Sequence, residues 1–500
     1  MGTRSGKLIV NSVYSVVAWM APLLMAFLAT PFVLKRIGTE VYGVYLVVLG
    51  FIGYSFTFNA ARAVAKFVAE LRGSQNVQKI NSAVTVAFAL NLSVGVIGAC
   101  ILAFLAEWLV GDVLHISPEL QRPAALAIMI GGLSIPAMLV GQVFQNILQG
   151  EQRFGTLSLI ANLNSALVNG GNVLLALTGF SIVALLIWSL SVTVAVSMVS
   201  LVAARRASPD LGITLNVSRE MVRPVVAYSS SMYVYQLCGG ALLLFERGLI
   251  VRNFGEAAAA YYVVPMTLAI YFHGFLTSVL TAAFPLLNEL LNDDARLAAL
   301  HRKSTKLLIA VTIPFFLTIL LGGQMFLALW IDKEFAANAY WLFVIHGATF
   351  SLMALMLAAW QLNETHHAAS LNAWITFISS AVSVGLMLYS VGPWHSEGVA
   401  LSRLAGVLLV VPIIFYSEKR FLGDVNRNEW VSQICRLIPA ALVFSVTEFL
   451  FFTFVGASWL TLVVGTLTAL SLYGLVLYAT RFISEDEKVL LFSLLGRSHG

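Results

Sequence analysis

Charged residues are scarce in this sequence of 500 residues. Only 11% are Asp, Glu, Lys or Arg and 59% are apolar, whereas a soluble domain carries about a quarter charged residues. This composition argues against a water-soluble globular protein. Cysteine is equally rare. Cys100, Cys238 and Cys435 lie in or beside apolar blocks, which argues against both a disulfide framework and a zinc site.

Several motifs that carry chemistry are also missing from the sequence. It contains no phosphate-binding loop, no Gly-x-Ser-x-Gly and no metalloprotease motif, so we expect neither an enzyme nor a bound cofactor. The adjacent His366 and His367 point in divergent directions, so we expect no metal site there. The net charge of +5 comes without a Lys/Arg run or interleaved aromatic residues, so nucleic acid is not an expected partner.

The apolar residues that dominate the chain arrive in long blocks. Blocks of roughly 20 to 28 residues are separated by short polar stretches, and such a block spans a hydrocarbon core about 30 Å thick. We therefore predict an all-α polytopic membrane protein with about fourteen transmembrane helices. The expected spans are residues 8–34, 41–62, 81–109, 122–148, 157–179, 181–204, 223–252, 259–285, 306–329, 338–361, 370–391, 397–416, 433–455 and 459–480.

The basic residues predict how these spans are oriented. With the N-terminus in the cytoplasm, about 22 Lys and Arg fall on the inner side and about five on the outer side, which satisfies the positive-inside rule. We therefore expect a bacterial inner-membrane protein with both termini in the cytoplasm. Every outer loop is short, so no outer domain is expected to host chemistry. The outer residues are Lys35, Arg36, Arg122, Arg252 and Lys333.

Two hairpins in the sequence resemble each other. Gly38 ends the first span and Tyr45 follows seven residues later, while Gly255 ends the seventh span and Tyr262 follows at the same distance. Six helices separate the copies, so we expect parallel repeats whose two lobes rock about a central cavity. Chance similarity between apolar hairpins is the alternative. The expected parts are an N-terminal lobe (1–205), a cytoplasmic linker (206–222), a C-terminal lobe (223–417), two accessory helices (433–480) and a cytoplasmic tail (481–500).

Polar side chains form narrow stripes on three of the predicted helices. Residues spaced three or four apart share one helical face. Such faces suggest a shared wet surface in the first lobe. Hydrogen bonding between helices, at about 0.6 kcal/mol per bond, is the alternative. The stripes are Ser55, Asn59, Arg62 and Lys66, then Gln142, Gln145, Asn146 and Gln149, then Asn162, Ser165, Asn169 and Asn172.

Charged residues fall in the interior of the seventh and twelfth predicted membrane helices. These are Glu246 and Arg247 in the seventh span and Arg403 in the twelfth. Each costs about 2.5–3.5 kcal/mol on insertion scales, so their presence indicates a function. Gln236 precedes Arg247 by about three turns and can face the same cavity. Neutralisation of Arg247 by a neighbour such as Glu246 is the alternative.

A cationic cavity predicts an anionic cargo. Arginine suits phosphate because its planar fork donates two parallel hydrogen bonds, and amide side chains suit sugar hydroxyls. Glu246 and His273 are candidates for ion coupling, although His273 is more simply explained as a hydrogen-bonded packing residue. Glu448 is interpreted as a buried neutral acid.

Taken in order, several segments resemble the polysaccharide (O-antigen and exopolysaccharide) flippases of the multidrug/oligosaccharidyl-lipid/polysaccharide exporter (MOP) superfamily. The resemblance covers most of the chain. Its segments are Asn11-Ser12, Arg36-Ile-Gly-Thr-Glu-Val-Tyr-Gly43, Leu148-Gln-Gly-Glu-Gln-Arg-Phe154, Glu246-Arg-Gly-Leu-Ile-Val-Arg-Asn-Phe-Gly255 with Tyr261-Tyr262, Phe284-Pro285, Pro314 and Gly398-Val-Ala-Leu-Ser-Arg403.

The resemblance implies a function. The implied architecture is two lobes of six helices around a cationic central cavity. The implied activity is transfer of an undecaprenyl-diphosphate-linked oligosaccharide from the cytoplasmic to the periplasmic leaflet. Membrane lipid and the polysaccharide polymerase or export machinery are the expected partners. Arg62 and Lys66 would receive the diphosphate, and Arg247 and Arg403 would hold it in the outward state. The chain departs from the family pattern at Glu246 and Asn59, where Asp and an acidic residue are usual, so a family ion site does not transfer simply.

Two other functions fit the predicted fold less well. A multidrug or small-molecule antiporter usually takes cationic cargo, which calls for net acidic charge in the cavity. A membrane sugar polymerase or ligase typically displays a sizeable outer loop, and none is predicted. The sequence indicates neither the glycan nor the energy source.

Overall fold

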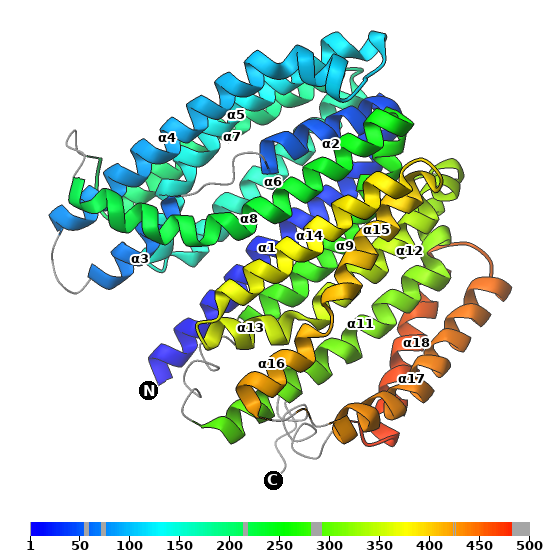
Figure 1. The fold of residues 1–500 in the computed structure, drawn as a ribbon. Helices are drawn as coiled ribbons and strands as arrows, with labels where there is room; N and C mark the ends of the chain where they lie inside the picture. The colour runs from blue at the N-terminus through cyan, green and yellow to red at the C-terminus, as the bar shows by residue number, and fades with distance from the viewer. Residues whose placement is uncertain are drawn as a thin grey trace. The chain divides into compact units, whose positions relative to one another are not determined.

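The protein is described here from a computed structural model that covers residues 2–54, 60–71, 77–213, 219–281, 293–423, 425 and 427–482. Throughout this part of the chain the secondary structure is helical, and no strand occurs in it (Figure 1). The predicted fold class, an all-α membrane protein, is confirmed.

The described residues form a succession of helices along the chain. Their bounds are α1 Gly2–Ile37, α2 Thr39–Tyr54, α3 Ala61–Leu71, α4 Val77–Trp108, the π-helix η1 Leu109–Val113, α5 Pro118–Gly150, α6 Phe154–Leu177, α7 Ile182–Ala207, α8 Arg219–Phe254, α9 Glu256–Thr281, α11 Asp294–Trp330, α12 Lys333–Leu355, α13 Leu357–Thr365, α14 Ala369–Ser390, α15 His395–Val410, α16 Ile413–Leu422, α17 Arg427–Phe454 and α18 Trp459–Ala479.

Twelve helical segments within the described residues are long and apolar enough to cross a membrane. They coincide with twelve of the predicted spans. The other two predicted spans fall on α2, which is apolar but has only 16 residues, and on α8, which is long but carries charges at both ends and in its interior. The count of about fourteen is thus approximate, and the chain is a multi-pass membrane protein.

The chain divides into two compact units. Unit 1 comprises Met1–Val264 and Ala373–Ser402, and unit 2 comprises Pro265–Asn372 and Arg403–Gly500. In unit 1, α5 packs against α4 and α7, and α1 packs against α6. In unit 2, α11 packs against α12 and α17, and α17 packs along α18.

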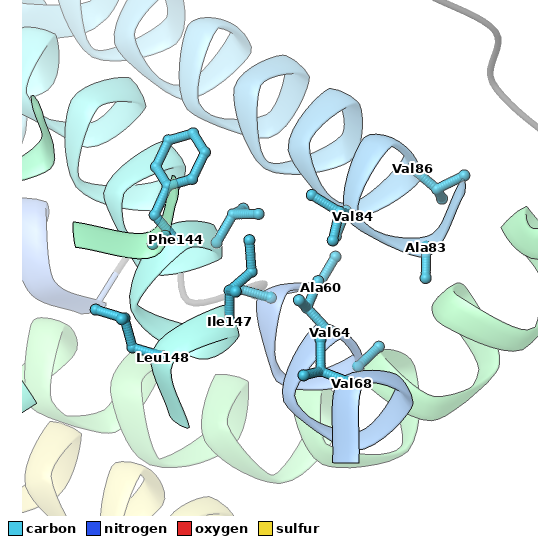
Figure 2. Packing of buried hydrophobic residues seen from close by; sticks show 14 of the residues in the cluster. Ala60, Val64, Val68, Ala83, Val84, Val86, Phe144, Ile147 and Leu148 are labelled. Atoms are coloured by element: carbon cyan, nitrogen blue, oxygen red, sulfur yellow. The ribbon is translucent and has the colours of Figure 1, made fainter. Parts of the chain in front are cut away.

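The short helix α3 is held in unit 1 by an apolar face. Val64 and Val68 are buried against residues of α4 and α5, among them Val84 and Ile147 (Figure 2). Gly150 permits this approach, because a Cβ there would lie 2.6 Å from the Cβ of Val68. The opposite face of α3 is charged and exposed, so α3 is an amphipathic helix on the core of unit 1.

One buried amide determines where α3 begins. The Asn91 side chain is 0% exposed. Its Oδ1 accepts a hydrogen bond from the Ala60 amide at 2.9 Å, and its Nδ2 donates to the Leu139 carbonyl at 2.8 Å. Asn91 thereby ties the turn before α3 to α4 and α5. Asn91 was not predicted from the sequence as a structural residue, because a single Asn in an apolar block does not form a polar stripe along a helix.

The two similar hairpins have the same turn. Gly38 and Gly255 adopt left-handed backbone conformations, with φ of 87° and 82°. Each donates its amide to the carbonyl four residues earlier, at 3.0 and 2.9 Å. Left-handed glycine after the last helical turn is a common helix cap. Tyr45 and Tyr262, seven residues on, are both buried. This shared geometry favours an internal repeat, whose symmetry axis stays a prediction.

The helix pair α17–α18 joins unit 2 through its own core. Phe444, Ala469 and Tyr473 are buried there. Glu448 is fully buried in this layer, and its Oε1 accepts hydrogen bonds from the hydroxyls of Thr318 at 2.8 Å and Thr466 at 3.0 Å. A carboxyl group thus links α17 to both α11 and α18.

Replacing Asn91 tests the role of the buried amide. We expect Asn91→Ala to lower the free energy of unfolding by about 1–3 kcal/mol, because the Ala60 amide loses its partner in a buried site. The measurement is the thermal unfolding midpoint of the purified protein. The control is Asn253→Ala, an exposed residue whose side chain donates to the Leu249 carbonyl of its own helix. Equal midpoints for the two variants would contradict this role.

Candidate functional site

The guanidinium of Arg247 lies against one face of α2. The side chain is 5% exposed. Its Nη1 donates to the Leu46 carbonyl at 2.7 Å, and its Cζ lies 5.1 Å from the centre of the Tyr54 ring. Leu46, Gly50 and Tyr54 are spaced by four and therefore share one helical face. A Cβ on Gly50 would lie 2.6 Å from the Arg247 Nη1, so the glycine makes room for the guanidinium.

Glu246 precedes Arg247 and is 0% exposed. Its burial puts an acid beside a base within one segment of α8, so neutralisation of Arg247 by its neighbour stays open. Gln236, three turns earlier on α8, is partly buried.

Arg403 is the buried arginine of unit 2. It lies on α15, is 6% exposed, and its Cζ lies 5.0 Å from the centre of the Phe350 ring. His273 packs edge-on against the same ring, with the two ring centres 6.1 Å apart. His346, one turn before Phe350 on α12, is fully buried and interacts electrostatically with Arg403. Phe350 therefore brings together two predicted residues, Arg403 and His273.

Phe350 and His346 were not predicted from the sequence. A contact with a cationic side chain is worth about 0.5–2 kcal/mol, less than the cost of about 2.5–3.5 kcal/mol of placing an arginine in a membrane helix. The ring alone does not offset the burial of Arg403. The spacing of four between His346 and Phe350 was the available signal, but it lies in a helix that is apolar on nearly every side.

Arg62 and Lys66 lie on α3 rather than on α2. Ala60 forms a turn, and α3 begins at Ala61, so the predicted stripe does not continue along one helix. Ser55 and Asn59 are outside the described residues. Both basic side chains are exposed, and Lys66 Nζ lies 3.7 Å from Glu70 Oε1. An exposed pair of this kind contributes about 0–1 kcal/mol. These cations thus lie on the surface of unit 1.

The stripe on α5 is partly buried and hydrogen-bonded. Gln145 donates to the Ser200 hydroxyl of α7 at 3.3 Å, and Asn146 donates to the Gln142 carbonyl of its own helix at 2.8 Å. The bond from Gln145 to Ser200 is of the kind expected from helix packing.

The stripe on α6 faces two neighbouring helices. Asn172 donates to the Tyr45 hydroxyl of α2 at 3.1 Å, and the Ser165 hydroxyl donates to the Pro22 carbonyl of α1 at 3.2 Å. Asn169 bonds back to Ser165 within α6. The Asn172 Oδ1 is buried without a hydrogen bond from the described residues. Packing therefore explains much of this stripe, while Asn172 keeps one acceptor available.

The described residues contain no group of three or more His, Cys, Asp or Glu side chains that could hold a metal ion. The site residues described above offer charge and hydrogen bonding, from arginine guanidinium groups and side-chain amides.

Gly50 provides a test of the Arg247 site. We expect Gly50→Ala to displace the guanidinium and to lower the free energy of unfolding by about 1–3 kcal/mol, the usual cost of overpacking. Gly53→Ala on the same helix is the control, because a Cβ there meets nothing within 4 Å. Thermal unfolding of both variants measures the difference, and a Gly50→Ala midpoint no lower than that of Gly53→Ala would refute the packing described.

Comparison with known proteins identifies the family. The model of the polysaccharide biosynthesis protein family matches residues 73–335. A protein of Shigella flexneri, provisionally assigned as an O-antigen transporter, is 21% identical over 409 residues, which cover 81% of this chain and 96% of that protein.

Solved structures share the fold. The lipid II flippase MurJ, in an inward closed conformation, has a TM-score of 0.70 and 12% identity over 98% of this chain and 100% of its own. An inward-facing multidrug resistance transporter of the MATE family has a TM-score of 0.70 and 13% identity over 81% of this chain and 98% of its own. With the family model matching more than half of its length, the chain belongs to the polysaccharide biosynthesis protein family.

Proposed function

We propose that this protein flips an undecaprenyl-diphosphate-linked oligosaccharide from the cytoplasmic to the periplasmic leaflet by alternating access, for surface polysaccharide synthesis. The observation that carries the proposal is a pair of arginines buried within helices, Arg247 in α8 and Arg403 in α15. A cation kept at this cost in a membrane helix calls for a function.

The chemistry of the guanidinium favours a phosphorylated cargo. Arginine stays charged when partly desolvated and donates two parallel bonds to phosphate. A diphosphate that leaves bulk water can therefore exchange its hydration for such groups.

The other predicted residues take supporting roles in this proposal. Arg62 and Lys66, on the exposed face of α3, attract the diphosphate before Arg247 and Arg403 hold it. The amides of Asn59, Gln142, Gln145, Asn146, Asn169, Asn172 and Gln236 are available to sugar hydroxyls where they are not committed to packing. Glu246 and His273 are the candidates for coupling to an ion.

The names of the relatives support this class of cargo. The Shigella flexneri protein is assigned to O-antigen, and MurJ is a flippase for lipid II. We further propose that the chain lies in the bacterial inner membrane with both termini in the cytoplasm, as the distribution of Lys and Arg indicates. The proposed protein partner is polysaccharide polymerase or export machinery. We also propose that the N-terminal lobe ends at residue 205 and that the C-terminal lobe begins at residue 223.

A multidrug antiporter is the second candidate, because a MATE transporter shares the fold. Cationic cargo would be repelled by Arg247 and Arg403, so the buried charges favour the anionic cargo.

Substitution of the two arginines tests the cargo. We expect Arg247→Gln and Arg403→Gln each to lower surface polysaccharide at least about tenfold, since losing one charged hydrogen bond costs about 1.5–3 kcal/mol. Lysine at either position is expected to restore part of the export, because it keeps the charge but lacks the planar fork. The measurement is surface polysaccharide in cells that lack the native gene, at equal protein level in the membrane.

The control for this experiment is Arg206→Gln, which removes an exposed charge at the end of α7 and should leave export unchanged. Full export by Arg62→Ala, Arg247→Ala and Arg403→Ala variants alike would rule out the proposed role of these cations.

A further inference from the structure

A cationic cavity of about 400 Å³ lies at one end of unit 2, outside the residues proposed to bind cargo. It is formed by the first turns of α11, the first turns of α17 and the two residues that follow Thr480. Five cationic side chains line it against a single carboxylate, that of Glu429. The cations are Arg302, Lys303, Lys306, Arg436 and Arg481.

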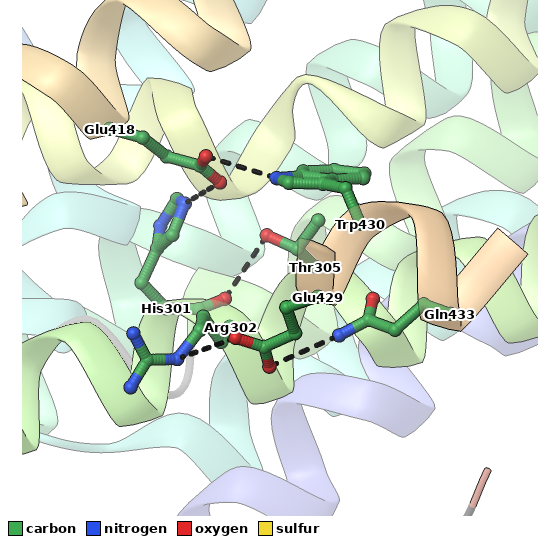
Figure 3. A network of polar contacts seen from close by, with 7 residues as sticks. All are labelled: His301, Arg302, Thr305, Glu418, Glu429, Trp430 and Gln433. Carbon is green, nitrogen blue, oxygen red and sulfur yellow. Dashed lines mark hydrogen bonds and ion pairs between the residues drawn. The ribbon is translucent and has the colours of Figure 1, made fainter. Parts of the chain in front are cut away.

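A polar network fixes the two helices that form the walls. Arg302 Nε lies 3.5 Å from Glu429 Oε2, and Gln433 donates to Glu429 Oε1 at 3.4 Å (Figure 3). Behind them, Glu418 of α16 accepts from Trp430 at 3.0 Å and lies 3.3 Å from His301 Nε2. The start of α17 is thereby held against both α11 and α16, so the wall does not depend on a bound anion.

The end of α18 supplies the third wall. Phe482 is 4% exposed within the core of α17 and α18, and its amide donates to the Leu477 carbonyl at 3.0 Å. Arg481, just before it, adopts a left-handed backbone with φ of 55°, at a position where helix ends usually carry glycine. Arg436 donates to the Arg481 carbonyl at 2.8 Å, which helps to hold that residue at the cavity.

Lys306 is positioned by the same segment. Its Nζ lies 4.8 Å from the centre of the Phe482 ring, so the ammonium stays at the cavity instead of extending into solvent. Arginine at position 481 strains a backbone that glycine would relieve. The cavity thus concentrates positive charge even though Arg481 holds a strained backbone conformation. Such local strain is a feature of binding sites.

The cavity lies at the boundary between polar and apolar surface. Leu307, one turn beyond Lys303 on α11, is 51% exposed, and Ile434 and Ile438 on α17 are 49% and 51% exposed. Exposed apolar side chains of membrane-spanning helices contact acyl chains. Trp430 lies at the same end of α17, as aromatic residues do at membrane interfaces. The cations are therefore placed at the level of lipid headgroups.

We infer that this cavity binds the phosphate of an anionic phospholipid headgroup. Basic pockets between helix ends recognise such headgroups, because each Lys or Arg gains from the negative surface and the phosphate oxygens accept several hydrogen bonds. A soluble anion would meet the same cations, but the adjoining exposed Leu307 favours a ligand that carries acyl chains. The site lies wholly in unit 2 and is independent of the proposed cargo.

The test is binding of phospholipid to the full-length protein. The variant is Lys303→Gln with Arg481→Gly, which removes two charges, relieves the backbone at 481 and leaves the Arg302–Glu429 pair intact. The matched control is Arg205→Gln with Arg206→Gln, which removes two exposed charges at the end of α7. Each protein is titrated with short-chain phosphatidylglycerol, with phosphatidylcholine and with inorganic pyrophosphate, and the unfolding midpoint is recorded.

We expect phosphatidylglycerol, and neither other ligand, to raise the midpoint of the unaltered protein and of the control. The variant is expected to bind it about 30-fold more weakly, the ratio that corresponds to about 1 kcal/mol for each charge removed. Equal effects of the two phospholipids, or equal affinity of variant and control, would overturn the inference. An equal effect of pyrophosphate would overturn the assignment to lipid in favour of a soluble anion.

Discussion

A guanidinium inside a membrane-spanning helix has to find its hydrogen-bond acceptors and aromatic faces within the protein, because the lipid around it provides neither. Arg247 and Arg403 meet this constraint in different ways. Arg247 uses a helix carbonyl, a tyrosine ring and the gap left by a glycine. Arg403 uses a phenylalanine ring that it shares with a histidine. Both arginines are buried, and the proposed flipping of a diphosphate depends on their positive charge.

Much of the architecture could be predicted from the sequence, because a helix that crosses a lipid bilayer needs a long apolar segment and such segments are visible in the sequence. Twelve predicted spans coincide with helices in the structure, and the predicted spans 41–62 and 223–252 fall on α2 and α8. The turn at Ala60 could not be predicted. It depends on a hydrogen bond that the Ala60 amide donates to Asn91, 31 residues further along the chain. The spacing of Arg62 and Lys66 was predicted correctly as helical, but these residues belong to α3 and not to the second predicted helix.

The candidate site was predictable to the extent that charge is conspicuous in an apolar sequence. Arg247 and Arg403 were found for that reason, and both are buried. Their partners were not found, because Phe350, His346 and Gly50 are ordinary residues of apolar helices. The amide stripes could be interpreted from the sequence either as a wet surface or as hydrogen bonding between helices. The bonds from Asn172 to Tyr45 and from Ser165 to Pro22 show how amides and hydroxyls that could face a cargo also join helices.

The central claim, that buried arginines carry a phosphorylated lipid across the membrane, is tested most directly by reconstitution. The protein is placed in liposomes with a fluorescent polyprenyl-diphosphate sugar, and the rate at which the probe becomes accessible on the opposite leaflet is measured. The account predicts rapid transfer by the unaltered protein, and a rate near that of protein-free liposomes for a variant with both Arg247→Gln and Arg403→Gln. Transfer by that variant at the unaltered rate would contradict it.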